Sequence, residues 1–240
     1  MAITLNKLRS ALVPATMPLA VLAGLPVLLL SRSRRSAINF STGLWADMST
    51  ALIGLQVELT GEEYLRSPRP AVFILNHQSN ADGFLVAKLI RSDIAYLGKA
   101  ELSKQRIRGR LMQWGGLILV DRSDPARASN AATAMIEAIR KNQLSAAIFP
   151  EGRRSHSTQL GRFKKGAFLI AMRTRVPLIP IVIHNSIDAQ PKGQSYYCPA
   201  TVHVEVLRPI DTSQWSMKTL DDHIDDVVSQ FRRVLGQEES

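Results

Sequence analysis

A histidine and an aspartate five residues apart follow a short apolar run in the first half of the chain. His77 and Asp82 come directly after Val72–Leu75, which has the composition of a buried strand. A helix is expected to begin near Asp82, and the turn from loop to helix can bring its carboxylate back to the imidazole. The carboxylate would hold one ring N–H and leave the other nitrogen free as a general base. Taken alone, the spacing also fits an ordinary helix-capping loop around Ser79 and Asn80.

Further polar and basic motifs follow along the chain, and each stands at an expected strand end or helix start. They occupy residues 99–102, 116–122, 149–155, 163–167 and 176–180. In an open α/β sheet, ligands bind beyond the carboxyl ends of the strands. The order of the motifs therefore predicts a single site that these segments form together with His77.

The elements that would carry these motifs alternate between strands and helices. Strand-like apolar runs occupy residues 71–75, 94–97, 117–120, 146–149, 178–184 and 202–207. Helices are expected over residues 81–90, 125–142 and 166–174, the second with Asp124 as its N-cap and Pro125 in its first turn. The alternation predicts an α/β fold with a mostly parallel sheet flanked by helices. We expect a catalytic domain over residues 61–240, preceded by a membrane-associated helical segment over residues 1–60.

The N-terminal segment contains a long uncharged stretch, residues 10–31, with two basic residues shortly before it and three after it. As a helix it would extend about 33 Å, enough to cross the hydrocarbon core of a bilayer. It could span the membrane, or it could dip into it as a helical pair interrupted at Pro14, Pro18 and Pro26. A cleaved signal peptide and a buried soluble helix are the alternatives. Residues 36–58 are a second helical candidate.

Composition narrows the classes of partner and of chemistry. The formal net charge is +10, and residues 153–187 carry seven basic side chains and no acid. This excess indicates an anionic partner, such as an anionic membrane surface or a phosphorylated substrate. Cys198 is the only cysteine, so an intrachain disulfide is impossible, and no cysteine–histidine cluster has the spacing of a zinc site. The motifs of serine hydrolases, P-loop proteins and dinucleotide-binding proteins are absent.

Taken together, the motifs between about residues 70 and 185 resemble those of the lysophosphatidic acid acyltransferase family, within the glycerolipid acyltransferase superfamily. The resemblance rests on the order of a His-x4-Asp block, an Asp-Arg block, a Pro-Glu-Gly block and a Val-Pro-Leu-Ile-Pro block. It implies an α/β catalytic domain with an N-terminal membrane-docking helical pair. It also implies acyl-CoA or acyl-carrier-protein donors, and neither a metal nor another cofactor.

The resemblance assigns roles to individual residues. It implies that His77 is the catalytic base and that Asp82 is its partner. Substrate binding is implied for the residues that match the later blocks, which are Lys99, Arg122 as the phosphate-binding arginine, Glu151, Gly152 and Arg154. The chain also departs from the family, since Arg153 replaces a frequent threonine and residues 103–110 are more polar than in many members.

We therefore expect an enzyme of phospholipid biosynthesis that acylates the free hydroxyl of a lysophospholipid, with 1-acylglycerol 3-phosphate giving phosphatidic acid. Lyso-ornithine lipid and glycerol 3-phosphate are alternative acceptors. A non-catalytic protein that binds anionic lipid or nucleic acid would explain the charge, but it would not explain His77 and Asp82 at a strand end. We expect no nucleic-acid partner. We also expect membrane association, with the catalytic domain on the cytoplasmic face.

Overall fold

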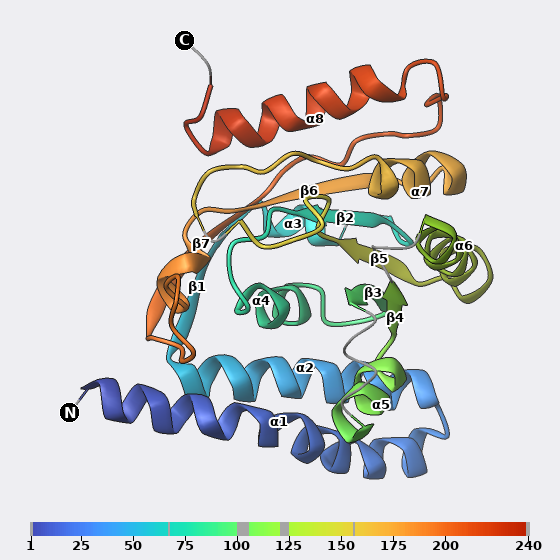
Figure 1. The fold of residues 1–240 in the computed structure, drawn as a ribbon. Helices are drawn as coiled ribbons and strands as arrows, with labels where there is room; N and C mark the ends of the chain where they lie inside the picture. Colours follow the sequence, from blue (N-terminus) through green and yellow to red (C-terminus); the bar gives the residue numbers. More distant parts are fainter. Residues whose placement is uncertain (1, 67, 100–105, 121–124, 156, 239–240) are drawn as a thin grey trace.

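A computed structural model describes residues 2–66, 68–99, 106–120, 125–155 and 157–238. These residues form a seven-stranded sheet in the order β1-β7-β6-β2-β5-β3-β4 (Figure 1). The strands are β1 (Leu55–Thr60), β2 (Val72–Leu75), β3 (Ile94–Lys99), β4 (Leu117–Val120), β5 (Ser145–Ile148), β6 (Leu178–Ile183) and β7 (Ala200–Val206). The five strands from β6 to β4 run parallel, whereas β7 is antiparallel to β6 and parallel to β1. The predicted α/β fold with a mostly parallel sheet is confirmed.

Helices cover both faces of this sheet. They are α1 (Ala2–Ser31), α2 (Arg34–Ile53), α3 (Glu62–Leu65), α4 (Asp82–Leu89), α5 (Arg106–Trp114), α6 (Pro125–Asn142), α7 (Gly166–Thr174), η2 (Ser186–Ala189) and α8 (Leu220–Val234). In Figure 1, α4 and the α1–α2 pair lie below the sheet, while α7 and α8 lie above it. The ends of α6 agree with the expected helix over 125–142, and its proposed cap, Asp124, lies outside the described residues.

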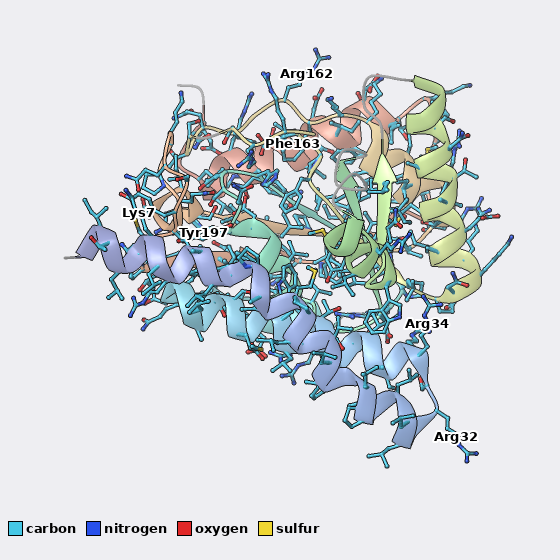
Figure 2. The ribbon with its side chains drawn as sticks, turned by 60° about the horizontal axis from the view of Figure 1, so that its bottom comes forward. Lys7, Arg32, Arg34, Arg162, Phe163 and Tyr197 are labelled. Atoms are coloured by element: carbon cyan, nitrogen blue, oxygen red, sulfur yellow. The ribbon has the colours of Figure 1, made fainter. Side chains whose placement is uncertain are left out.

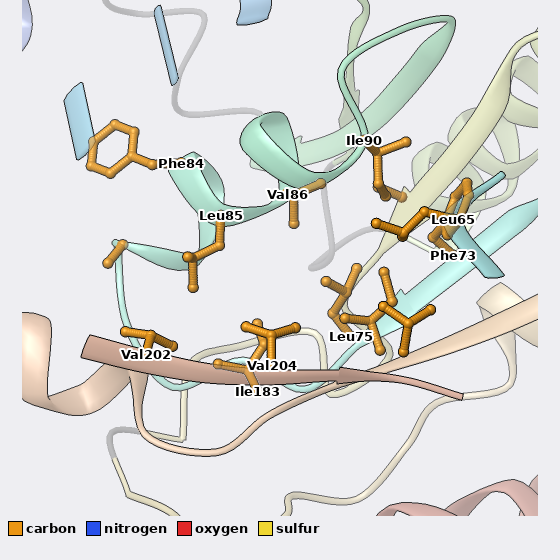
Figure 3. Close-up of a cluster of buried hydrophobic side chains, with 14 of the residues drawn as sticks. Leu65, Phe73, Leu75, Phe84, Leu85, Val86, Ile90, Ile183, Val202 and Val204 are labelled. Atoms are coloured by element: carbon orange, nitrogen blue, oxygen red, sulfur yellow. The ribbon is translucent and has the colours of Figure 1, made fainter. Parts of the chain in front are cut away.

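Strand β2 lies in the middle of the sheet, and both of its faces are buried. Phe73 and Leu75 pack toward α4, in the cluster shown in Figure 3, whereas Val72 and Ile74 pack toward α6, α7 and α8. All four side chains have no exposed surface. This burial explains why the strand is a continuous apolar run and does not alternate with polar residues. It also places the end of β2, and the residues that follow it, on a rigid element.

The N-terminal helices form an antiparallel pair (Figure 1). The predicted N-terminal helical pair is confirmed as α1 and α2. The alternative of an interruption within residues 10–31 is wrong, because α1 is one helix that contains Pro14, Pro18 and Pro26. All three prolines lie on the exposed side of α1, so their rings do not disturb its packing against α2. The chain turns at Arg32, which has a φ of 53°, and the Ser33 hydroxyl then accepts a hydrogen bond from the Ser36 N–H.

The second helix ends earlier than the expected range of 36–58. It stops at Ile53 because Gly54 adopts the left-handed conformation, with a φ of 73°, and caps the helix with its N–H. The chain then enters β1, an edge strand whose side chains alternate between more buried and more exposed positions. Residues Leu55–Thr60 therefore belong to the sheet, paired in register with β7.

Candidate active site

The loop between β2 and α4 brings His77 and Asp82 together. The Nδ1 atom of His77 lies 2.7 Å from Oδ2 of Asp82. The Asp82 side chain is fully buried, whereas the imidazole keeps 20% of its surface exposed. The backbone N–H groups of Gln78 and Ser79 donate to the same carboxylate oxygen at 2.8 and 2.9 Å. This geometry selects the tautomer with a proton on Nδ1, which leaves Nε2 as a hydrogen-bond acceptor.

Two buried amide side chains attach this loop to the end of β6. The side chain of Asn76 donates to the Ile183 carbonyl and accepts from the Ile183 N–H, both at 2.7 Å. The Gln78 side chain donates to the carbonyls of Ile183 and His184 at 3.0 and 3.2 Å. These amides continue the pairing of β2 with β6 beyond the last paired residues of the strands. Sequence reasoning gave neither amide a role, because in the sequence each is only a polar residue shortly after a buried strand.

The turn after β5 lies directly beside the His77 loop. Strands β2 and β5 are parallel neighbours, so the connections that follow them meet at one edge of the sheet. The Phe149 ring stacks on the imidazole with centroids 4.1 Å apart and planes at 20°. The turn requires glycine at position 152, whose φ of 76° belongs to the left-handed region. Ser155 closes the contact, since its N–H donates to the His77 carbonyl at 2.8 Å.

Glu151 faces the backbone of this loop. Its Oε1 accepts a hydrogen bond from the His77 N–H at 2.7 Å, and its Oε2 accepts one from the Gly161 N–H at 3.1 Å. Only 7% of the residue is exposed. Burial raises the pKa of the Glu151 carboxyl above its usual value, although both N–H donors favour the ionised form.

A cavity of about 430 Å³ opens beside His77. Most of its wall is apolar, with side chains from α1, α2, α4, β3 and α5, among them Met17, Trp45 and Met112. Phe149, Arg153 and Arg154 line the same cavity next to His77. The arrangement combines a basic and polar end with a long apolar part, which suits an amphiphilic ligand.

The remaining predicted site residues are distributed as follows. Lys99 is the last residue of β3, paired with Val120 through the backbone, and its side chain is not among those described. Arg122 lies outside the described residues, so its role at the site stays a prediction. Within the described part of the chain, no group of three or more His, Cys, Asp or Glu side chains could hold a metal ion.

Several cations near the cavity have no ion-pair partner among the residues that the structure describes. Arg154 is half-buried and Arg153 exposed, and neither contacts an acidic side chain of the described residues. Lys164 lies over Gly152, since a Cβ on that glycine would be 3.1 Å from its Nζ. Lys165, by contrast, pairs with Asp221 at 2.6 Å. Sequence reasoning noted Arg153 only as a departure from the family, although it lines the cavity.

Comparisons with known proteins agree with this site. A profile of the family described as Acyltransferase matches residues 56–184. The chain is 31% identical over 173 residues to a 1-acyl-sn-glycerol-3-phosphate acyltransferase from Limnanthes alba, which covers 72% of this chain and 61% of that protein. It is 30% identical over 186 residues to the enzyme of the same name from Salmonella typhimurium (strain LT2), which covers 78% of this chain and 74% of that protein. The chain thus spans about three-fifths of the plant relative's length.

A solved structure extends the likeness to the N-terminal helices. The crystal structure of the 1-acyl-sn-glycerophosphate (LPA) acyltransferase PlsC from Thermotoga maritima superposes with a TM-score of 0.75 at 25% sequence identity. The match covers 98% of this chain and 99% of the other. It therefore includes α1 and α2 as well as the sheet.

Proposed function

Since this chain belongs to the acyltransferase family, we propose that it transfers a fatty acyl group from a thioester donor to the free hydroxyl of 1-acylglycerol 3-phosphate, giving phosphatidic acid. The observation that carries the proposal is the His77–Asp82 pair beside a mostly apolar cavity, which also contains two arginines that pair with no acidic side chain of the described residues. A base, a phosphate-binding group and space for an acyl chain are the three requirements of this reaction.

The proposed mechanism uses His77 as a general base. Its Nε2 takes the proton of the acceptor hydroxyl while the oxygen attacks the thioester carbonyl carbon. The Asp82 carboxylate stabilises the imidazolium and keeps the ring in place through Nδ1. The tetrahedral intermediate then collapses, the carbon–sulfur bond breaks, and the imidazolium returns its proton to the thiolate. The stacked Phe149 ring limits rotation of the imidazole between these two proton transfers.

We assign the phosphate of the acceptor to Arg154. This arginine lines the cavity with His77 and has no acidic partner among the described residues. A guanidinium group binds a phosphate through two parallel hydrogen bonds. Arg122, and Lys99 at the end of β3, remain candidates for the same phosphate by their resemblance to the family. Gly152 contributes by its backbone, because the left-handed turn at this residue directs the following arginines to the cavity.

We assign the donor's phosphate groups to Arg153 and Lys164. Arg153 is exposed at the cavity, and Lys164 lies over the neighbouring Gly152. CoA and acyl-carrier protein both present their thioester on a phosphopantetheine arm, so a cationic rim suits either donor. The more highly phosphorylated CoA would gain more from two cations than a carrier protein with one phosphodiester.

We propose that α1 dips into the membrane surface and does not span the bilayer. The helix is long and apolar enough to span by length and composition, with a mean hydropathy of 2.0 over its apolar window. Its middle part, however, lies against the protein: the Thr16 and Ser49 hydroxyls are 2.8 Å apart, and Ser10 accepts a hydrogen bond from the Tyr197 N–H at 2.7 Å. A spanning α1 would draw these parts of the catalytic domain into the bilayer, which is costly for polar backbone.

The charges at both ends of α1 support this position. Figure 2 shows Lys7 near the N-terminal end of the helix and Arg32 beyond its C-terminal end, with Arg34 at the start of α2. Basic residues on both ends can contact anionic head groups of one leaflet at about 1 kcal/mol each. This arrangement accords with a catalytic domain that stays on the cytoplasmic face.

An acceptor panel tests the proposed function. Purified protein would receive acyl-CoA or acyl-carrier protein with 1-acylglycerol 3-phosphate, lyso-ornithine lipid or glycerol 3-phosphate. We expect the highest kcat/KM with 1-acylglycerol 3-phosphate and at least about a hundredfold loss in His77→Ala. Arg154→Ala should raise the KM for the phosphate-bearing acceptor by about tenfold or more, because a charged hydrogen-bond partner is lost. Turnover of lyso-ornithine lipid that Arg154→Ala leaves unchanged would replace our acceptor with that alternative.

A further inference from the structure

We propose that Glu151 is a positioning residue that holds the backbone of His77, and that it does not bind the acceptor. This inference rests on the proposed role of His77 as the base. The resemblance to the family implies substrate binding for Glu151, but the geometry points to a different role. Its two carboxylate oxygens are used by two backbone N–H groups, from His77 at 2.7 Å and from Gly161 at 3.1 Å.

The position of Glu151 separates it from the cavity. Arg153 and Arg154 line the cavity, whereas Glu151, from the same turn, is not among the residues of its described wall. Its carboxylate lies behind the catalytic loop, and the residue is only 7% exposed. An acceptor in the cavity would therefore reach the arginines without touching Glu151.

The His77 peptide is held on both sides by the chain that follows β5. Glu151 accepts from its N–H, while Ser155 donates to its carbonyl through the backbone N–H at 2.8 Å and through the hydroxyl at 3.2 Å. Asp82 holds the ring through Nδ1, and Phe149 covers one ring face. Because the ring is fixed by Asp82 and the backbone by Glu151, the position of Nε2 depends on both carboxylates.

Gly161 is the second part of this arrangement. A Cβ at this position would lie 2.3 Å from Oε2 of Glu151, far inside van der Waals contact. Glycine is therefore required there because of the close approach of the carboxylate. An alanine at 161 would displace the Glu151 carboxylate while leaving every cavity residue unchanged.

The test separates positioning from acceptor binding by kcat and KM. Glu151→Gln can satisfy only one of the two N–H groups, and Gly161→Ala displaces the carboxylate without removing it. Gly166→Ala is the matched control, because a Cβ there has no atom within 4 Å. Each variant would be assayed at varied acceptor and donor concentrations, and its unfolding would be followed by circular dichroism.

We expect Glu151→Gln and Gly161→Ala to lower kcat by about ten- to a hundredfold, since small displacements of a catalytic group have effects of this size. Their KM for the acceptor should stay within about threefold of the wild-type value, and Gly166→Ala should match the wild type. A tenfold higher acceptor KM with an unchanged kcat would overturn the proposal, and so would wild-type kinetics in both variants. If Glu151→Gln does not fold, the kinetics of Gly161→Ala alone decide between positioning and acceptor binding.

The proposed function can fail separately. If the wild type prefers another lysolipid, the acceptor assignment is wrong, and the same kcat and KM comparison is made with that acceptor.

Discussion

The substitution Asp82→Asn tests how the proposed catalytic pair of His77 and Asp82 works. The imidazole Nδ1 and the backbone N–H groups of Gln78 and Ser79 all reach the same oxygen, Oδ2 of Asp82, at 2.7, 2.8 and 2.9 Å. Because three N–H donors point to the position of Oδ2, an asparagine would place its amide oxygen there. The variant should therefore keep the ring orientation and the tautomer of His77. Its main loss is the negative charge next to the imidazolium.

The size of this loss follows from the distance between the groups. Two unit charges about 4 Å apart interact by about 4 kcal/mol at an effective dielectric constant of about 20. If the imidazolium is between half and fully formed in the transition state, the loss is about 2–4 kcal/mol, or roughly thirty- to a thousandfold in kcat. The amide nitrogen would occupy the site of Oδ1, which is buried without a hydrogen-bond partner in the described part of the chain. An unsatisfied buried donor costs about 1–3 kcal/mol of folding stability.

The assay is steady-state kcat at saturating donor and acceptor, together with urea unfolding. Asp82→Ala serves as the comparison, because it also removes the three contacts to the loop and should be both slower and less stable than Asp82→Asn. A kcat of Asp82→Asn within about threefold of the wild type would show that the charge is not used. A loss in kcat well beyond about a thousandfold would show that the ring had turned or changed its tautomer. Either result would refute this reasoning.

Three further predictions concern the donor, the membrane and pH. Arg153→Thr should raise the KM for acyl-CoA several-fold and leave that for acyl-pantetheine unchanged, whereas Arg162→Thr, an exposed cation outside the described cavity wall, should alter neither. Leu22 and Leu29 are 60% and 76% exposed, so replacing both with Ser should release the protein from vesicles in sedimentation assays without changing its urea midpoint. The raised pKa of Glu151 means that its contribution to stability is present below the unfolded pKa and lost as pH rises through the folded pKa. We therefore expect a difference in unfolding free energy, wild type minus Glu151→Gln, that falls from pH 4 to pH 7. A difference that rises over this range would contradict the prediction.

The parts of the fold that sequence predicted are those set by local patterns. Val72–Leu75 was recognisable as a strand because it is apolar throughout and buried on both faces. The approach of Asp82 to His77 was expected because the short turn from the loop into α4 determines it. The end of α2 was missed because it depends on the left-handed Gly54, and the residues after it pair with β7, far along the chain. Tertiary pairing of this kind overrides local propensity.

Glu151 illustrates a different limit of prediction from sequence. Its sequence block indicates that the residue belongs to the site, but not whether its carboxylate faces the ligand or the backbone. That choice depends on Gly161, ten residues later, whose missing side chain makes room for Oε2. The sequence also did not reveal whether α1 continues through its prolines, since this depends on which side of the helix faces α2.

The position of α1 would connect a membrane to the proposed active site. Met17 and Val21, one helical turn apart, line the cavity that contains His77. Leu19 and Leu22 point outward, with 51% and 60% of their surface exposed. One face of the helix therefore forms the cavity wall while the other is apolar and uncovered among the described residues. If this outer face lies in the leaflet, an acyl chain can pass between the bilayer and the cavity without crossing water. The free energy of transferring the chain is then lower by about 25 cal/mol for each Å² of apolar surface that stays covered. A spanning helix would touch the domain only at one end and would give no such passage, so the lengthwise packing of α1 itself favours the dipping arrangement.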